Sequence, residues 1–281
     1  MPAMTERTLI AIEDPADPRI VEFSQIRERD LTGRAGQFIA EGTVVLRMLA
    51  AANRAGRGIR AEKLLLLRNR VDGVADLLAA FPGDVPVYVA EAPVLDAIAG
   101  FHLHRGVLAL GRRDVGDSTD TLIAALPQES LVLVGCGISN HDNVGALFRN
   151  AAAFGADAVL LDETCCDPLY RKALRVSVGS VLTTPYARSG SSQALLGGLS
   201  EKGFAIWALS PAGEVEIGEI VPQARMALVM GTEGEGLPKA ILDRFHTARI
   251  AQSPGLDSLN VGTASGIALY SMAKAMGRLQ G

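Results

Sequence analysis

The strongest constraint on the fold of this chain is a set of short, uninterrupted apolar runs in its C-terminal half. Each run has the length of a strand, and helix-like segments separate them: LVLVG (131–135), AVLLD (158–162), FAIWALS (204–210), MALVMG (226–231) and TARIA (247–251). Strands that are apolar on both faces belong to parallel sheets, because helices there bury both faces. We therefore expect an α/β domain with a parallel sheet in this half.

Two helices are predicted with that sheet, and a smaller α/β domain precedes it. The helices are NVGALFRNAAAFG (143–155), which Gly155 ends, and a last helix over 261–278. In the N-terminal part, Asp17 and Pro18 indicate a helix start. A helix is expected over 44–54, among strands that read FIAEG (38–42), KLLLL (63–67), VPVYVA (85–90) and GVLAL (106–110). The polar stretch 112–120 is interpreted as a linker, which gives domains 1–115 and 116–281.

Composition excludes several classes of protein. The chain has 281 residues, 48% of them hydrophobic, and it has no apolar run of membrane-spanning length and no signal-peptide pattern. Its three cysteines include the adjacent pair Cys165 and Cys166, and they form no disulfide framework. The four histidines lie far from them in sequence, so we expect no metal site. We expect a reduced, cytoplasmic protein.

Charge alone does not identify a partner. The net charge of −4 argues mildly against a protein coated in nucleic acid, because phosphate contacts require Lys and Arg. The N-terminal part nevertheless holds a local basic cluster, which is either a solvated face or an RNA path: Arg54, Arg57, Arg60, Lys63, Arg68 and Arg70.

The two common nucleotide-binding patterns are missing. A dinucleotide-binding fold carries G-x-G-x-x-G after its first strand. Here the first C-terminal strand leads into GCGISNHDNVG (135–145), which lacks the third glycine. The chain also has no GxxxxGK[ST] segment, so a nucleoside triphosphatase is not indicated.

Three other segments carry residues suited to chemistry. In GTEGEGLP (231–238), Gly231, Gly234 and Gly236 permit close backbone approach or positive φ, and Glu233 stands among them. A tight loop with a surface glutamate is the alternative interpretation.

The second segment is SPGLDSLNVGTASGIALYS (253–271), in which Ser258 and Asn260 stand at a helix start. Both are capping residues, and the first turn of a helix can also hold an anion. The third segment, N-x-G-x-x-x-R, is formed by Asn143, Gly145 and Arg149. Asn143 is placed to cap the predicted helix, and Arg149 is either functional or solvated.

In order and combination, these segments resemble the SpoU (TrmH-like) family of RNA 2′-O-ribose methyltransferases in the SPOUT superfamily. The matching motifs are NVGALFRNAAAFGAD, LVMGTEGEGLP and IAQSPGLDSLNVGTASGIALY, and DPLYRKALRVSVGS (167–180) is also similar. GQFIAEGTVVLRMLA resembles the family's ribosomal-protein-like RNA-binding extension. There are two departures: Ala251 stands where the family usually has Pro, and Gly262 where it often has Ser.

The resemblance implies a fold, a cofactor and a set of site residues. It implies a C-terminal parallel-sheet domain with a deep trefoil knot, after a small N-terminal RNA-binding domain. The knot would bind S-adenosylmethionine, without a metal, through Leu209, Gly231, Gly234, Ile250 and Leu259. The expected catalytic residues are Asn143, Arg149, Glu233, Ser258 and Asn260.

Arg149 would clamp the target phosphate and stabilise the developing alkoxide, since a guanidinium resists deprotonation. Glu233 would orient Arg149 or a backbone amide. Arg171, Lys172 and Arg175 are further candidates for RNA contacts, with a solvated face as the alternative. The resemblance implies a homodimer that acts on ribosomal RNA or transfer RNA. A non-catalytic RNA-binding or ribosome-assembly protein with the same knot is the alternative function.

Overall fold

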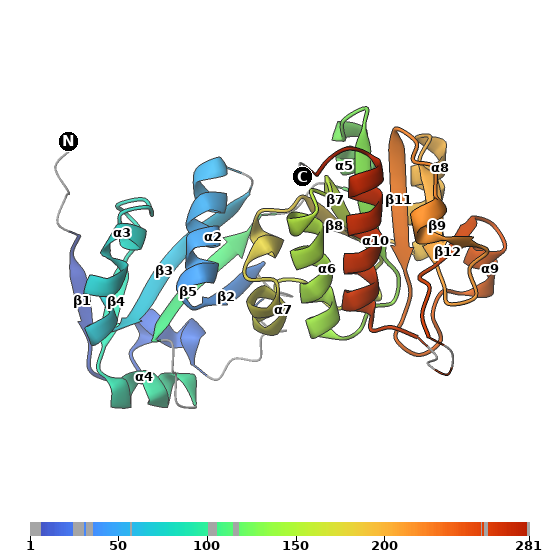
Figure 1. Cartoon of the computed structure of the whole chain (residues 1–281). Helices are drawn as coiled ribbons and strands as arrows, with labels where there is room; N and C mark the ends of the chain where they lie inside the picture. Colours follow the sequence, from blue (N-terminus) through green and yellow to red (C-terminus); the bar gives the residue numbers. More distant parts are fainter. Residues whose placement is uncertain are drawn as a thin grey trace. The chain divides into compact units, whose positions relative to one another are not determined.

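The computed structural model describes residues 7–24, 31, 36–56, 58–100, 106–114, 118–253, 255 and 258–279. The chain forms two compact units (Figure 1): unit 1 comprises Met1–Gly116 and Leu169–Thr183, and unit 2 comprises Asp117–Pro168 and Thr184–Gly281. The expected boundary at 115/116 falls outside the described residues. The sequence also did not indicate that Leu169–Thr183, from the C-terminal half, packs with the N-terminal unit.

Unit 2 is built on a parallel sheet, as expected. Its seven strands lie in the order β10-β12-β9-β11-β6-β7-β8, and every pairing is parallel. The bounds are β6 Ser130–Gly135, β7 Ala158–Leu161, β8 Tyr186–Arg188, β9 Ala205–Leu209, β10 Val215–Glu216, β11 Arg225–Met230 and β12 His246–Arg249. All five predicted runs form strands, and the two short edge strands β8 and β10 were not predicted.

Helices cover this sheet and complete its core. They are α5 Thr119–Ala125, α6 His141–Ala153, α8 Ser192–Glu201, η5 Ile217–Glu219, α9 Lys239–Leu242 and α10 Val261–Ala275. One core cluster joins Val132, Val134 and Val229 of the sheet to Leu195 and Leu199 of α8. Among the described helices, none has the length and apolar character needed to cross a membrane.

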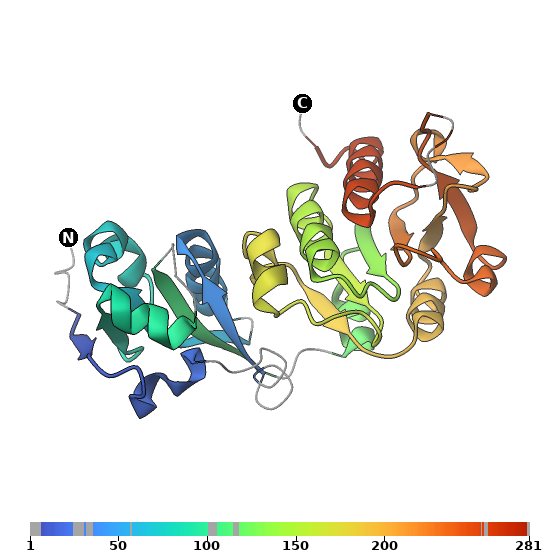
Figure 2. The same ribbon diagram turned by 90° about the horizontal axis from the view of Figure 1, so that it is seen from below.

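The helices α6 and α10 pack side by side, as Figures 1 and 2 show. Asn150 of α6 donates from Nδ2 to the Gly262 carbonyl at 2.7 Å and to Ser265 Oγ at 2.9 Å. The small residues at the start of α10 therefore serve close packing within one chain. This packing fixes the N-terminus of α10 against α6.

Unit 1 contains a mixed five-stranded sheet in the order β1-β4-β3-β5-β2. Its strands are β1 Leu9–Ile12, β2 Gln37–Glu41, β3 Ile59–Leu67, β4 Val87–Ala90 and β5 Val107–Arg113. Its helices are η1 Pro18–Phe23, α2 Thr43–Ala55, η2 Arg68–Arg70, η3 Asp72–Val74, α3 Ala75–Leu78, α4 Ala92–Ala99, α7 Arg171–Val176 and η4 Ser180–Leu182. The four predicted strands are present, and β1 was not predicted.

Three predicted boundaries are wrong. The stretch interpreted as a linker contains the end of β5 at Arg113 and the start of α5 at Thr119. The last helix ends at Ala275 rather than at 278. The helix α6 begins at His141, because Asn140 caps it by accepting the Asp142 N–H at 2.8 Å.

Candidate functional site

A cavity of about 260 Å³ lies where three neighbouring strands of unit 2 end. The strands β12, β9 and β11 are adjacent and parallel, so their carboxyl ends meet at one edge of the sheet, where α/β folds place ligands. The loops after these strands and the turn before α10 line this strand-end cavity. All five residues expected to bind a cofactor line it: Leu209, Gly231, Gly234, Ile250 and Leu259.

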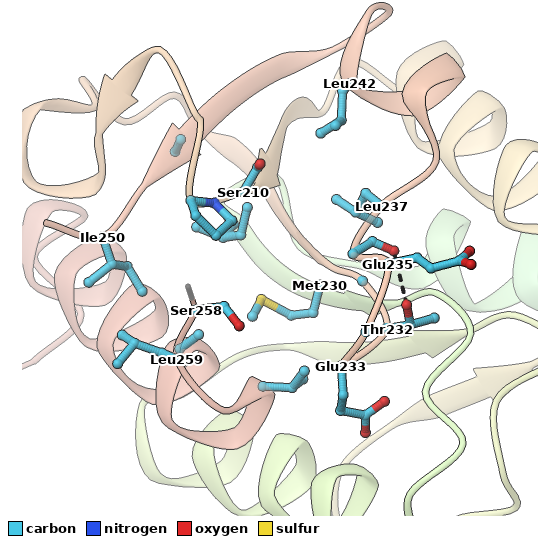
Figure 3. A pocket seen from close by; sticks show the side chains of 18 of the residues that line it. Ser210, Met230, Thr232, Glu233, Glu235, Leu237, Leu242, Ile250, Ser258 and Leu259 are labelled. Atoms are coloured by element: carbon cyan, nitrogen blue, oxygen red, sulfur yellow. Dashed lines mark hydrogen bonds between the residues drawn. The ribbon is translucent and has the colours of Figure 1, made fainter. Parts of the chain in front are cut away.

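The wall of the strand-end cavity is largely apolar. In Figure 3, Ile250 and Leu259 lie on one side, Leu237 and Leu242 lie on the other, and Met230 lies between them. Ser210, Glu233, Glu235, Gln252 and Ser258 supply polar groups. Such a wall suits a flat, mostly apolar ligand that a few polar groups orient.

The loop after β11 requires glycine at Gly231. A side chain there would put its Cβ 2.4 Å from the Gly236 carbonyl carbon, because the loop turns back on itself. Two hydrogen bonds to the Gly236 carbonyl close this loop, from Thr232 N and from Thr232 Oγ1, both at 3.2 Å. Figure 3 shows the one from Oγ1. Gly236 has a φ of 71°, which favours glycine. The loop therefore holds Glu233 at its exposed tip.

Three expected catalytic residues form one hydrogen-bonded chain. Asn143 is buried, with 4% of its surface exposed, and donates from Nδ2 to Glu233 Oε1. Its Oδ1 accepts from Asn260 Nδ2 at 2.9 Å. The expectation that Asn143 caps α6 is wrong, because Asn140 does so and Asn143 lies one turn inside. That position directs its amide to the two other motifs.

Asn260 has two roles at the start of α10. Its Oδ1 accepts the Gly262 N–H at 2.8 Å and the Thr263 N–H at 3.3 Å, which confirms the capping interpretation. Its Nδ2 is thereby left to reach Asn143. Ser258 is exposed and lines the strand-end cavity, as do Glu233 and Leu259.

Arg149 lies apart from this chain of hydrogen bonds. It is exposed on α6 and forms no hydrogen bond or ion pair with any described residue. The expectation that Glu233 orients Arg149 is not met, because Glu233 accepts from Asn143 instead. The Arg149 guanidinium is therefore available to a ligand.

The three expected RNA contacts lie in α7, which belongs to unit 1. Arg171 lies 3.9 Å from the carboxylate of Glu41, Lys172 is exposed, and Arg175 is exposed. Arg175 and Arg70 both line a second cavity, of about 500 Å³, which we call the Arg70–Arg175 cavity. No carboxylate among the described residues lines it.

The N-terminal basic cluster is partly neutralised. Arg60 pairs with Asp114 at 3.4 Å, Lys63 with Glu22 at 2.9 Å, and Arg68 with Glu91 at 2.7 Å. These three fit the solvated-face interpretation. Arg57 lies outside the described residues.

A buried carboxylate supports the loop that leads into α6. Asp162, which is 4% exposed, accepts from Gly137 N at 3.1 Å, Thr164 Oγ1 at 2.7 Å and Cys165 N at 3.0 Å. Burial, and secondly the Asp162 charge, raise the pKa of the Cys136 thiol to about 12 and hold that of Cys165 well above its usual range. Both thiols are free, and their raised pKa values make them poor nucleophiles.

Gln252 is a cavity residue that the sequence did not identify. It lines the strand-end cavity, and its Oε1 is buried without a hydrogen-bond partner among the described residues. The available signal was a single amide two positions after Ile250, at the end of an apolar strand. Such a signal is weak, because polar residues commonly follow strands.

Comparisons with known proteins agree on one family. A model of the SpoU rRNA methylase family matches residues 130–270. An uncharacterized tRNA/rRNA methyltransferase of Mycobacterium bovis is 37% identical over 273 residues, 93% of this chain and 91% of the relative. A solved AdoMet-bound rRNA methyltransferase from Sinorhizobium meliloti is 25% identical, with a TM-score of 0.77 over 97% of this chain and 99% of the other. A solved RNA 2′-O ribose methyltransferase is 26% identical, with a TM-score of 0.77 over 96% and 99%. The chain, from its motifs to its fold, therefore belongs to the SpoU rRNA methylase family.

Proposed function

We propose that this protein transfers a methyl group from S-adenosylmethionine to a ribose 2′-hydroxyl of ribosomal RNA, with transfer RNA as the second substrate class. The observation that carries the proposal is the hydrogen-bonded chain of Glu233, Asn143 and Asn260, with Glu233 on the wall of an apolar cavity. The rRNA methyltransferase from S. meliloti, similar over nearly the whole chain, has S-adenosylmethionine bound.

The strand-end cavity fits the adenosine part of this cofactor. Its apolar side chains, among them Leu209, Ile250 and Leu259, suit a flat purine, and backbone groups of the same residues would orient it. The buried, unpartnered Oε1 of Gln252 adds an acceptor that calls for a donor from a ligand. When bound, the cofactor supplies an activated methyl group on its sulfonium, so the protein mainly positions and polarises.

The hydrogen-bonded residues, together with Ser258, would then position the RNA. Glu233 and Asn260 hold the Asn143 amide between them, which fixes the distance between α6 and the two loops. Ser258, exposed at the cavity, offers a hydroxyl to the ribose. These contacts would hold the 2′-oxygen in line with the methyl group.

Arg149 serves as a phosphate clamp in this proposal. Its exposed guanidinium lies on α6, six residues beyond Asn143, and has no described partner, so its donors are available for bidentate binding. A guanidinium is a poor base, and stabilisation of the developing alkoxide is the role that suits it.

Unit 1 is proposed to bind RNA. Arg70 and Arg175 line one cavity, and neither guanidinium forms an ion pair or hydrogen bond with a described residue. The neighbouring Val44 and Val178 are exposed and apolar. Two unpaired guanidinium groups beside an apolar surface suit a phosphate and its attached nucleoside.

The family resemblance further leads us to propose a trefoil knot in unit 2, a cytoplasmic location and a homodimer. Tight packing of the small residues of α10 is already explained by α6, so it does not argue for a dimer. Support comes instead from Ile267 and Tyr270 of α10, which are 37% and 47% exposed. Tyr270→Glu should shift the mass measured by light scattering toward that of a monomer.

Methyl transfer tests the proposed function directly. The purified chain is incubated with radiolabelled S-adenosylmethionine and bulk rRNA or tRNA, and 2′-O-methyl sites are mapped in RNA from cells with and without the gene. We expect labelled rRNA and one site that disappears with the gene. RNA binding without any label would support the non-catalytic alternative, and label on a base would overturn ribose methylation.

A further inference from the structure

Gln252 is the one residue whose buried side-chain polar atom lacks a partner in the described part of the chain. The atom is Oε1, and the side chain lines the strand-end cavity rather than the core of a unit. The polar side chains nearest in sequence, those of Ser253 and Arg249, offer it no donor: Ser253 is exposed, and Arg249 donates to the Gly213 and Glu214 carbonyls. The described part of the chain therefore does not explain this amide.

An unpaired buried acceptor is expensive to keep. Leaving one unsatisfied costs about 1–3 kcal/mol, a penalty that an apolar side chain of similar shape would avoid. The surrounding wall is apolar, with Ile250 and Leu259 nearby in sequence. An acceptor at such a place is explained if a ligand brings a donor to it.

Because the Gln252 amide is neutral, it favours some donors over others. An ammonium group would favour the carboxylates of Glu233 or Glu235, which line the same cavity. A neutral donor suits the neutral Gln252 oxygen. A glutamine side chain also matches the edge of adenine, because its oxygen accepts from the 6-amino group while its NH₂ donates to a ring nitrogen.

We infer that Gln252 is a specificity-determining residue that recognises the adenine ring of the cofactor through this paired contact. The inference rests on the proposed function, since it assigns the adenine end of the same cavity. Oε1 accepts from the 6-amino group, and Nε2 donates to a neighbouring ring nitrogen. A purine without the 6-amino group leaves Oε1 unpaired and binds more weakly.

Calorimetry with S-adenosylhomocysteine tests this without any turnover. The probes are S-adenosylhomocysteine and its analogue with unsubstituted purine in place of adenine. For the natural chain we expect the adenine compound to bind about tenfold more tightly. In Gln252→Met, which keeps the volume and removes both polar groups, we expect the two affinities to lie within about twofold.

Two further variants complete the design. Gln252→Glu keeps an acceptor and loses the donor, so it should retain the preference for the 6-amino group with weaker binding of both probes. Gln223→Met makes the same chemical change at an exposed residue outside the cavity and should change neither affinity. Each variant is first checked for an unchanged thermal midpoint without ligand.

The outcomes separate this inference from the proposed function. If the natural chain and Gln252→Met prefer the adenine probe over the purine probe by the same factor, the role of Gln252 is overturned and the cofactor assignment stays intact. No binding of S-adenosylhomocysteine to the natural chain would overturn the cofactor assignment, and the inference with it. A preference for adenine that disappears in Gln252→Met and persists in Gln223→Met would establish the contact.

Discussion

The Asn260 side chain donates from Nδ2 to Asn143 Oδ1 at 2.9 Å, across 117 positions of sequence. The same side chain caps α10 through its oxygen, so helix formation and site geometry depend on one residue. Asn143 in turn donates from Nδ2 to Glu233 Oε1. Helix α6 and two loops that the sequence separates widely are therefore joined in one hydrogen-bonded group.

Replacing Asn260 with Asp should separate the two roles. Asp caps helices about as well as Asn, so we expect the free energy of unfolding to change by less than about 0.5 kcal/mol. The donor to Asn143 is lost, and flipping the Asn143 amide cannot repair this: Asn143 would lie between two carboxylates, and its NH₂ can donate toward only one of them while its oxygen faces the other. We expect kcat for methyl transfer to fall at least about tenfold, with affinity for S-adenosylhomocysteine retained.

The matched variant Asn260→Ala loses both the cap and the donor. It should cost about 1 kcal/mol of stability in addition to the loss of activity. Full activity in Asn260→Asp would show that the link to Asn143 is dispensable.

Close packing explains why this chain has Gly262 where the family often has Ser. A Cβ at this position would lie 2.7 Å from the Cβ of Ala146 and 3.0 Å from Asn260 Oδ1. Gly262→Ser should therefore destabilise the protein by about 1–3 kcal/mol, measured by urea unfolding. Adding Ala146→Gly removes the facing methyl. The double variant should therefore lose less stability than the sum of the losses measured in the two single variants. Additive effects would contradict the proposed clash.

Much of the fold could be predicted from local sequence, because continuous apolar runs such as LVLVG and MALVMG permit few structures other than buried parallel strands. Capping by Asn260 was also predictable, since it depends on residues two and three positions away. Strands β8 and β10 were missed, since they have only three and two residues.

Long-range contacts could not be predicted in the same way. The Asn143 to Glu233 bond spans 90 positions, and nothing near Asn143 distinguishes it from a capping residue. The packing of Leu169–Thr183 with unit 1 is equally non-local. There, the backbone of Gly179 lies so close to Met48 that a Cβ would come within 2.8 Å of its side chain. The motifs indicated which residues matter, and only the fold shows which of them touch.

Arg149→Lys tests the clamp directly. Lysine keeps the positive charge and loses the planar fork, so a bidentate phosphate contact should be lost. We expect kcat/KM for RNA to fall by about 100-fold, with an unchanged pH dependence, as for oxyanion stabilisation. Because the side chain is exposed and has no partner among the described residues, stability should change by less than about 0.5 kcal/mol. Retained turnover with a shifted pH optimum would instead favour a proton-transfer role.

Two thiols, one buried and one partly buried, should make the protein sensitive to alkali. Burial raises the pKa of Cys136 from 9.0 to about 12 and that of Cys166 to about 11. Well below pH 9 each thiol is protonated in both states, so stability is unaffected there. Above pH 9 the unfolded chain releases protons that the folded chain retains. The buried Cys136 thiol therefore lowers the free energy of unfolding by at most about 1.4 kcal/mol per pH unit until its folded pKa is reached, and the partly exposed Cys166 thiol lowers it by less.

Urea unfolding of Cys136→Ala between pH 8 and pH 11 checks whether the Cys136 thiol lowers the stability of the natural chain as the pH rises. The difference in stability from the natural chain should be constant up to about pH 9 and should then shift in favour of the variant. A difference that stays constant to pH 11 would show that Cys136 titrates normally in the folded protein.

Arg175→Glu and Arg70→Glu test RNA binding by unit 1. The two guanidinium groups line one cavity without described partners, so each substitution should remove about one phosphate contact and add repulsion. We expect weaker binding of rRNA fragments and a salt dependence whose slope falls by about 1 for each lost contact. Affinity for S-adenosylhomocysteine should not change, because the strand-end cavity belongs to unit 2.

The matched control is Arg68→Glu, since the Arg68 guanidinium is already paired with Glu91 at 2.7 Å. If Arg68→Glu weakens RNA binding as much as Arg175→Glu does, the effect is general charge repulsion, and the Arg70–Arg175 cavity is not the binding site.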